Sequence, residues 1–460
     1  MQIKKKDINK ILTIFLFAHI LVWTLIPTLS NVNLPLDTIE ALAWSSNLDW
    51  GYSKHPPLSA LSVEFFYQIF GNQDWSYYLL SQLFVGFSFY VIFKFSEDFF
   101  EDKIYSLFSV LILEGIYFYN YTTPEFNVNV CQLPFWALTV FYCWEGIKKN
   151  TYTNWLLLGL FAGLGILSKY LFIYLLIAID FYFIYLLLRK KINYNFFISL
   201  VSFFIILIPH FIWLEKSNYS SITYAMHRTG LDAINLLDHF YYPITFLAKQ
   251  IGILVPFLIM FLFLISKFKT KINFNDKRLV FLIAINLIPL LLIFLTSLVL
   301  GIKIRTMWMT PFYLFFGVLF FYIYKKNIIL KNTRYFLSVF LILFIFSPSL
   351  YFYISKTQTD KRTDYEGKKI SKIIQDEWDN NFTDDIKLVG GDEWYGGNLS
   401  YHLKSRPNWD NILENKSKIN LNDINGGFII VGNVNILQNI CRGIFLEIDN
   451  QGFCLIGKKK

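Results

Sequence analysis

The chain has 460 residues, of which 55% are hydrophobic and 20% aromatic, with 49 phenylalanines. This apolar share excludes an ordinary soluble domain as a description of the whole chain. The formal net charge of +9 does not indicate nucleic-acid binding. Lysine and arginine gather at the ends of hydrophobic runs, where the positive-inside rule places them in membrane proteins.

Long apolar runs continue as far as Tyr353 and predict about eleven transmembrane helices. Met1–Lys10 is rich in lysine and is predicted to lie inside, which places the segment after the first span outside. The first run has no clear small-residue cleavage site, so we expect it to be a retained helix. In chain order the predicted spans are Ile11–Leu29, Trp75–Phe95, Ile104–Tyr121, Val128–Glu145, Trp155–Leu167, Leu171–Leu188, Phe196–Leu214, Phe246–Ser266, Leu279–Leu300, Trp308–Tyr324 and Tyr335–Phe352.

Two carboxylates follow the first span, in the segment Leu34–Leu58. Asp37 and Glu40 are three residues apart and share one face if the segment is helical. Apolar residues on another face predict an amphipathic helix lying flat on the membrane. The alternative is a capping box, in which Asp37 caps the helix and Glu40 reaches back to it. The two interpretations are compatible, because a capping aspartate keeps one oxygen exposed.

The second half of this segment carries a cation and a histidine. Pro56 and Pro57 stop any helix, and the turn before them can hold Lys54 and His55 beside the carboxylates. Acid, base and cation together at a membrane surface indicate transfer chemistry on a charged lipid substrate.

Cations in the predicted outer loops run against the positive-inside rule. A functional reason for them is binding of a phosphate at the interface, and the alternative is anchoring to lipid headgroups. Lys54, Lys169 and Arg305 are the strongest candidates because they lie at span ends. The predicted outer cations before the tail are Lys54, Lys169, Lys216, Arg228, Lys303 and Arg305.

Three ionisable residues fall inside predicted spans, where each needs a polar partner. They are Glu114, Asp180 and His210. We expect interhelical hydrogen bonds or protonated acids there, with a proton or ion path as the alternative.

The tail, residues 354–460, is more polar and predicts a small α/β domain. Lys387–Val389 and Gly427–Val431 read as strands, and Asp364–Asp379 reads as a helix. Cys441 lies just before a predicted hairpin and Cys454 within its second arm, so pairing across the hairpin favours a disulfide in an oxidising compartment. Two buried free thiols are the alternative.

The motifs resemble those of the GT-C glycosyltransferases, in the branch of the protein O-mannosyltransferases and the lipid A aminoarabinose transferase. The resemblance is most specific in Leu34–Leu58, where the family pattern D-x-x-E-A-x-x-W then W-G-Y-x-x-(H/K)-P-P-L is met. Members often have a second acid directly after the first Asp, and Thr38 stands there in this chain. Weaker matches are Thr123-Pro124-Glu125, Gly163–Tyr170, Pro209 with Trp213, and Gly390–Pro407.

The resemblance implies a polytopic α-helical membrane protein of GT-C type with a small α/β C-terminal periplasmic domain. Its division would be a transmembrane part with amphipathic outer-loop helices, residues 1–353, and a periplasmic domain, residues 354–460. It implies a bacterial inner-membrane glycosyltransferase that takes a sugar from a polyprenyl-phosphate donor to an envelope acceptor, which is lipid A, a glycan or a protein.

The resemblance also implies roles for residues. Asp37 would be the general base, with Glu40 as the second catalytic carboxylate. Glu125 is a candidate for acceptor or metal binding, and a divalent cation is left open as a cofactor. The residues expected to bind the donor phosphate are Lys54, His55, Lys169, Tyr170 and Arg305.

The rival interpretation is a transporter or flippase of lipid-linked sugars. It accounts for the spans and the intramembrane acids, but not for the acidic outer helix, the Pro-Pro turn or the folded tail. No two-half repeat of the kind found in many transporters is evident.

Overall fold

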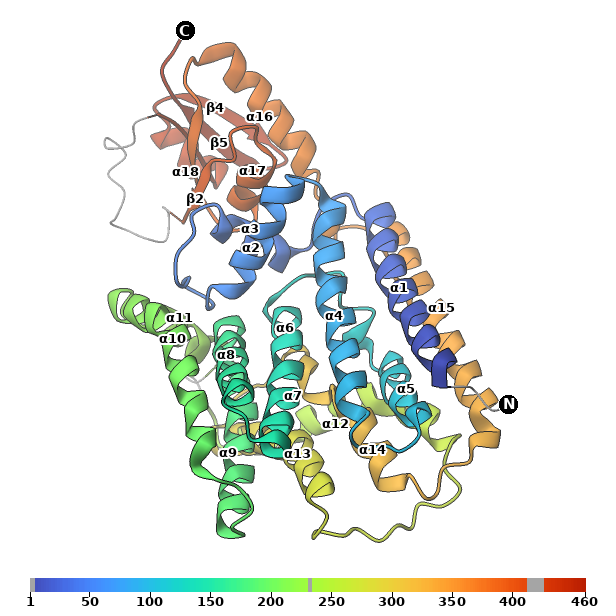
Figure 1. Cartoon of the computed structure of the whole chain (residues 1–460). Helices are drawn as coiled ribbons and strands as arrows, with labels where there is room; N and C mark the ends of the chain where they lie inside the picture. The colour runs from blue at the N-terminus through green and yellow to red at the C-terminus, as the bar shows by residue number, and fades with distance from the viewer. Residues whose placement is uncertain (1–4, 231–233, 412–425) are drawn as a thin grey trace.

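The computed structural model describes residues 5–230, 234–411 and 426–460. Its long helices lie side by side, and a smaller sheet domain lies beyond one end of them (Figure 1). Between the two lie the short helices α2 (Leu36–Ser45) and α3 (Leu58–Phe70). The segment that carries the candidate carboxylates is therefore enclosed between two parts of the molecule.

Within the described residues, seven helices are long and apolar enough to cross a membrane, as judged by length and composition. Each overlaps a predicted span, although the helix predicted as Phe246–Ser266 runs from Asp238 to Leu262. They contain α1 (Lys5–Ser30), α4 (Asp74–Ser96), α9 (Ile173–Leu188), α10 (Ile198–Lys216), α12 (Asp238–Leu262), α13 (Lys277–Leu300) and α15 (Thr333–Thr357).

An eighth predicted span, Trp308–Tyr324, is a bent pair: the 3-10 helix η5 (Thr306–Tyr313) and α14 (Phe316–Tyr324), at 51° to each other. Three other predicted spans are shorter or interrupted. They correspond to α5 (Lys103–Leu111) with the 3-10 turns Ile112–Gly115 and Tyr117–Tyr119, to α6 (Val128–Cys131) with α7 (Leu133–Lys149), and to α8 (Tyr152–Ser168). The described residues thus contain fewer full-length spans than the eleven predicted.

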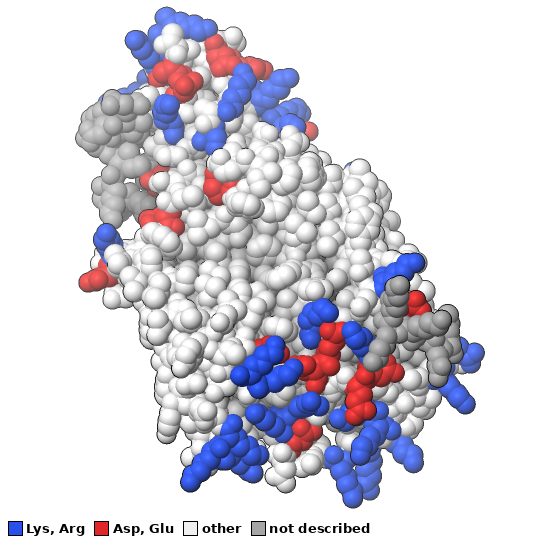
Figure 2. Space-filling view, in the orientation of Figure 1, with Lys and Arg blue, Asp and Glu red and all other residues white. Residues whose placement is uncertain are grey.

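The distribution of charge agrees with a membrane protein. On the face shown in Figure 2 a broad white band crosses the helices, with Lys, Arg, Asp and Glu gathered at the end opposite the sheet domain and on the sheet domain itself. Large apolar side chains such as Phe204, Ile251 and Ile345 are exposed on the helices. A belt of this kind suits contact with lipid. The protein is a multi-pass α-helical membrane protein.

The C-terminal part contains a five-stranded sheet in the order β2-β1-β3-β5-β4. The first three strands in that order pair in parallel, and β5 pairs antiparallel with both β3 and β4. The predicted strands Lys387–Val389 and Gly427–Val431 are confirmed within β1 and β3. The strands are β1 (Ile386–Gly390), β2 (Asn408–Asp410), β3 (Gly427–Gly432), β4 (Ile444–Ile448) and β5 (Gln451–Ile456).

Helices cover both faces of this sheet. One apolar cluster joins α16 (Gly367–Asn381) and α17 (Tyr395–His402) to the strands, and a second places Leu437 of α18 (Val434–Ile440) on the other face. Trp394 and Tyr401 belong instead to the main core of the transmembrane part. The C-terminal part is thus docked through buried aromatic side chains. Its boundary at 353/354 stays a prediction, and α15 continues to Thr357.

Candidate active site

The helix α2 presents Asp37 and Glu40 on one face, as predicted. Its N-cap is Pro35, which forms no side-chain capping bond. The capping box is therefore wrong: the Asp37 backbone N–H donates to Glu125 Oε1 at 3.1 Å, so the capping carboxyl comes from another segment. The Asp37 carboxylate therefore takes no part in capping α2.

The apolar face of α2 does not lie on the membrane, which corrects the prediction of a flat amphipathic helix. Ile39 and Ala43 are buried against α17, where a Cβ on Gly397 would lie 3.0 Å from both side chains. A side chain at residue 397 would therefore push the two helices apart slightly. The helix is amphipathic as predicted, but its apolar face packs on the C-terminal part of the protein and not on lipid.

Lys54 joins the two parts of the molecule at the site. Its ammonium lies 2.8 Å from Glu40 Oε1 and 3.0 Å from Glu393 Oε1. Burial lowers the pKa of Lys54, but the two carboxylates outweigh it and the net shift is upward. Glu393 was not predicted, although it lies within Gly390–Pro407, the tail segment that carried a weak family match. Burial likewise raises the pKa of Glu40, against the opposing charge of Lys54.

Lys169 is buried at the C-terminal end of α8. Its ammonium hydrogen-bonds Asn129 Oδ1 and lies 5.2 Å from the centre of the Trp308 ring. Burial lowers the pKa of Lys169 to about 7, although the charge of Asp37 opposes the shift. Burial also raises the pKa of Asp37, opposed by Lys169, Lys54, Arg228 and Arg305. The candidate base therefore faces a set of cations.

A cavity of 270 Å³ brings several predicted residues together, namely Lys54, His55, Lys169 and Tyr170. Arg228 lines it as well, whereas Arg305 does not and acts on Asp37 and Lys169 only through its charge. Tyr224 and Trp308 complete its aromatic side, and neither was predicted. Because 20% of the residues are aromatic, the sequence does not distinguish these two site residues from the other aromatic residues.

His55 contributes no positive charge to this cavity. Burial, together with the charges of Lys169, Lys54 and Arg228, lowers the pKa of His55 to about 3. The imidazole is therefore neutral at pH 7. Its ring centre lies 5.9 Å from that of Trp44 and 6.2 Å from that of Tyr224.

Glu125 is the third carboxyl of the site. Burial and the charge of Asp37 raise its pKa to about 8, so it is largely protonated at pH 7. In the described part of the chain no cluster of three or more His, Cys, Asp or Glu side chains suits a metal ion. Glu40 is paired with Lys54 and Glu125 with a backbone N–H.

The ionisable residues of the predicted spans have different surroundings. His19 Nδ1 lies 2.6 Å from Glu114 Oε1, and His210 contacts the Trp50 carbonyl oxygen and the Tyr170 hydroxyl. The expectation of interhelical hydrogen bonds is confirmed for these two. Asp180 is exposed on the surface of α9.

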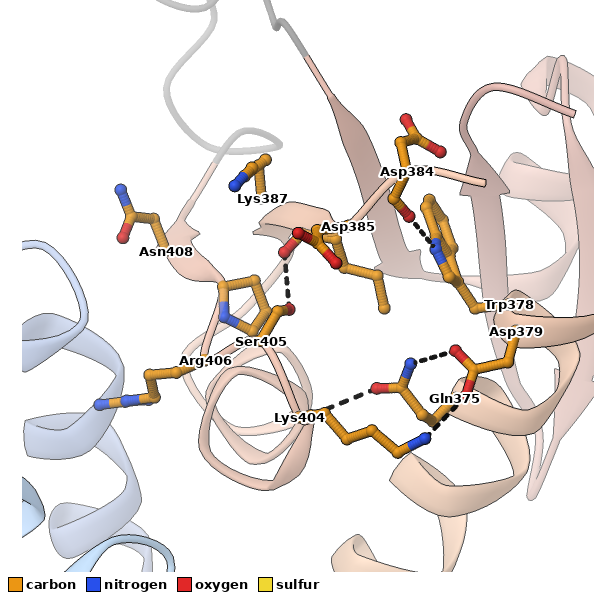
Figure 3. Close-up of a pocket in the computed structure, with 12 residues that line it drawn as sticks. Gln375, Trp378, Asp379, Asp384, Asp385, Lys387, Lys404, Ser405, Arg406 and Asn408 are labelled. Carbon is orange, nitrogen blue, oxygen red and sulfur yellow. Dashed lines mark hydrogen bonds and ion pairs between the residues drawn. The ribbon is translucent and has the colours of Figure 1, made fainter. Parts of the chain in front are cut away.

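Another cavity, of 590 Å³, lies away from these residues in the C-terminal part (Figure 3). Its polar groups bond one another: Asp379 accepts from Lys404 at 2.7 Å and from Gln375 at 2.8 Å. The Arg406 side chain points out of it, toward the helices of the transmembrane part. The residues predicted to form the site do not line this cavity.

Comparison with known proteins supports the family resemblance. Residues 54–213 match the family model of dolichyl-phosphate-mannose-protein mannosyltransferases. A curated relative, the undecaprenyl phosphate-alpha-4-amino-4-deoxy-L-arabinose arabinosyl transferase of Wigglesworthia glossinidia brevipalpis, is 30% identical over 213 residues. That alignment covers 42% of this chain and 37% of the relative.

Two solved structures share the fold along almost the whole chain. The crystal structure of ArnT from Cupriavidus metallidurans bound to undecaprenyl phosphate superposes with a TM-score of 0.62 at 12% identity, covering 98% of each chain. The apo form of the same protein gives 0.60 at 13% identity, covering 97% of this chain and 98% of that one. The predicted GT-C architecture is confirmed, as is the resemblance to transferases of this type.

Proposed function

We propose that this chain, which has the fold of the ArnT transferases, is a glycosyltransferase of the bacterial inner membrane. It would move a sugar from a polyprenyl-phosphate donor to an acceptor of the cell envelope, on the outer face of the membrane. The observation that carries the proposal is the half-buried Asp37, which feels the charges of Lys54, Lys169, Arg228 and Arg305. The first three of these cations line the 270 Å³ cavity.

Asp37 acts as the general base in the proposed reaction. It takes the proton of the acceptor hydroxyl while that oxygen forms a bond to the anomeric carbon of the sugar. The bond between that carbon and the phosphate oxygen breaks, and its electron pair leaves with the lipid phosphate. Displacement in one step inverts the anomeric centre.

The cavity cations supply what the leaving group needs. A departing phosphate carries negative charge, and preorganised cations in a water-poor site stabilise that charge as it develops. Lys169 and Arg228 are placed for this from α8 and α11 (Ser220–Thr229). Lys54, which is paired with Glu40 of α2 and with Glu393, adds a third positive charge to the cavity lining. The undecaprenyl phosphate bound by the solved ArnT relative has the same chemistry.

The test uses purified full-length protein in detergent with a polyprenyl-phosphate sugar and an envelope extract as acceptor. We expect free polyprenyl phosphate and labelled acceptor to appear together. Asp37→Asn should lose at least about 100-fold in transfer, the scale of removing a general base, while keeping its fold because Asp37 does not cap α2. Asp7→Asn, on the exposed first turn of α1, is the matched control.

Near-wild-type turnover by Asp37→Asn would contradict this mechanism. Movement of intact donor across a vesicle membrane without release of polyprenyl phosphate would instead indicate a transporter.

A further inference from the structure

A second cavity of 280 Å³ lies beside the first and differs from it in chemistry. Three tryptophans line it, Trp44 from α2, Trp213 from α10 and Trp409 from β2, together with Tyr52. Its charged lining residues, Asp49 and Asp410, are both acids. Among the described residues that line it there is no lysine or arginine, whereas the first cavity is lined by Lys54, Lys169 and Arg228.

We infer that this tryptophan cavity binds the saccharide portion of the acceptor, through neutral sugar rings that carry hydroxyl groups. The inference rests on the proposed function and adds the class of acceptor. A sugar ring has a C–H face that suits the negative face of an aromatic ring. Its hydroxyls need acceptors and donors of the kind that Asp49, Asp410, Asn47 and Asn411 provide around the rings. A phosphate would meet two acids, Asp49 and Asp410, as the charged groups of the described lining.

The rings are fixed before any ligand arrives. Trp213 donates its indole N–H to Asp49 Oδ2 at 2.9 Å and stacks on His210. Its ring also occupies the space that any side chain at Gly51 would need. Such preorganisation lowers the entropic cost of binding.

Trp409 is held from both parts of the molecule. Its backbone N–H donates to Ser46 Oγ of the α2 C-cap at 2.7 Å, and its indole N–H donates to the Asp392 carbonyl oxygen at 3.2 Å. The ring lies so close to Gly396 that a Cβ there would be 2.9 Å from it. The C-terminal part thus contributes a wall of the cavity.

Trp44 supplies an unused donor. The residue is 3% exposed, and its indole N–H has no hydrogen-bond partner in the part of the chain that the structure describes. Buried indole N–H groups usually have one. This free donor belongs to a residue of the cavity wall.

The position of Trp44 connects the two cavities. Asp37, Glu40 and Trp44 occupy one face of α2, with Trp44 about 10 Å along the axis from Asp37. Trp44 stacks on Tyr52, which lines the tryptophan cavity, and meets the edge of His55, which lines the cation cavity. A saccharide held in the tryptophan cavity extends along α2 toward the proposed base. The donor phosphate would lie in the cation cavity.

The experiment measures binding by isothermal titration calorimetry with the full-length protein in detergent, without donor. The probes are the methyl glycosides of glucose, galactose, mannose and N-acetylglucosamine, with inorganic phosphate and a Ser/Thr-rich peptide as comparisons. We expect saturable binding of at least one glycoside. Trp409→Ala should weaken that binding about tenfold or more, the scale of losing an aromatic anchor, and Trp409→Phe should restore most of it.

Trp75→Ala is the control, because Trp75 lies at the start of α4 and contacts Phe70 outside both cavities. Affinity for undecaprenyl phosphate should be the same in all three variants, which separates failure of this inference from failure of the proposed function. The inference is wrong if no glycoside binds, if Trp409→Ala binds like wild type, or if the peptide alone binds in a Trp409-dependent way.

Discussion

Lys169 keeps an ammonium group in a buried position because three different contacts favour the charged form. Asn129 accepts its hydrogen bond, the Trp308 ring lies beneath it, and the charge of Asp37 opposes the effect of burial. With a pKa of about 7, a small change in pH alters the charge that a lipid phosphate would meet.

This balance predicts a pH dependence of donor binding. Since the pKa of a lysine lowered to about 7 leaves the amine neutral above that pH, affinity for undecaprenyl phosphate should fall as the pH rises from 6 to 8. Lys169→Arg stays charged, so the affinity of this variant should fall less over the same range. Lys169→Ala should weaken binding about tenfold or more at pH 6, whereas Lys216→Ala, at the exposed end of α10, should change it little. The measurement is a Kd at each pH, and equal effects of the two alanine variants would contradict the argument.

For single residues, the sequence predicted which side chains form the site better than it predicted which side chains they pair with. The motif of Leu34–Leu58 was sufficient to select Asp37, Glu40, Lys54 and His55 as neighbours. It was not sufficient to predict Glu393, which is more than three hundred residues away in the chain, or to rank Arg228 above Arg305. Those depend on how α11 and the C-terminal part fold over the site, which no local pattern encodes.

The N-terminus of α2 is capped by a side chain from a distant segment of the chain. Its first turn is capped by Glu125, whose pKa is raised to about 8 by burial and by the charge of Asp37. A carboxyl whose folded pKa exceeds its ordinary value of 4.5 binds a proton more readily in the folded state. It therefore stabilises the fold least at high pH.

The prediction is a pH-dependent difference in stability between wild type and Glu125→Gln. As the pH rises from 5 to 8, the wild-type Tm should fall relative to that of the glutamine variant, which keeps the acceptor oxygen but does not ionise. Glu125→Ala leaves the Asp37 N–H unpaired and should cost about 1–3 kcal/mol at any pH in this range. Parallel Tm curves for wild type and Glu125→Gln would contradict the raised pKa.

Hydropathy predicted the long elements well and the interrupted ones poorly. The predicted span Ile104–Tyr121 breaks at Ile112–Gly115, where a Cβ on Gly115 would lie 2.6 Å from the backbone of Phe257 in α12. The freed polar groups find partners inside the protein, since Asn120 donates to the Glu114 carbonyl oxygen. Such breaks are tolerated where protein surrounds them, and an apolar sequence does not reveal them.

For the molecule as a whole, the contacts of the C-terminal part fix its side of the membrane relative to the site. Arg406 donates to the Leu42 carbonyl oxygen of α2 at 2.7 Å, and Glu393 pairs with Lys54. The sheet domain and Asp37 must therefore lie on one side, however many helices cross between them. Locating either one locates both.

The state of the disulfide can show on which side of the membrane the C-terminal part lies. Cys441 follows α18 and bonds to Cys454 of β5, with 5.6 Å between their Cα atoms, while Cys131 and Cys143 are free and buried. The hairpin of β4 and β5 is confirmed, although Cys441 lies before β4 and not within it. The bridge closes a short loop and should stabilise the C-terminal part by about 3 kcal/mol in the chain-entropy model.

Disulfides persist in oxidising compartments such as the periplasm, so the state of this bond in cells reports on the site. Protein from cells lysed in acid, which stops thiol exchange, is then denatured and labelled. It should label at Cys131 and Cys143 alone, and at all four cysteines after reduction. A Cys441→Ser, Cys454→Ser double variant should label at two positions in both conditions. Full labelling of the wild type without reductant would place the C-terminal part, and with it Asp37, in a reducing compartment, and would contradict an outward-facing site.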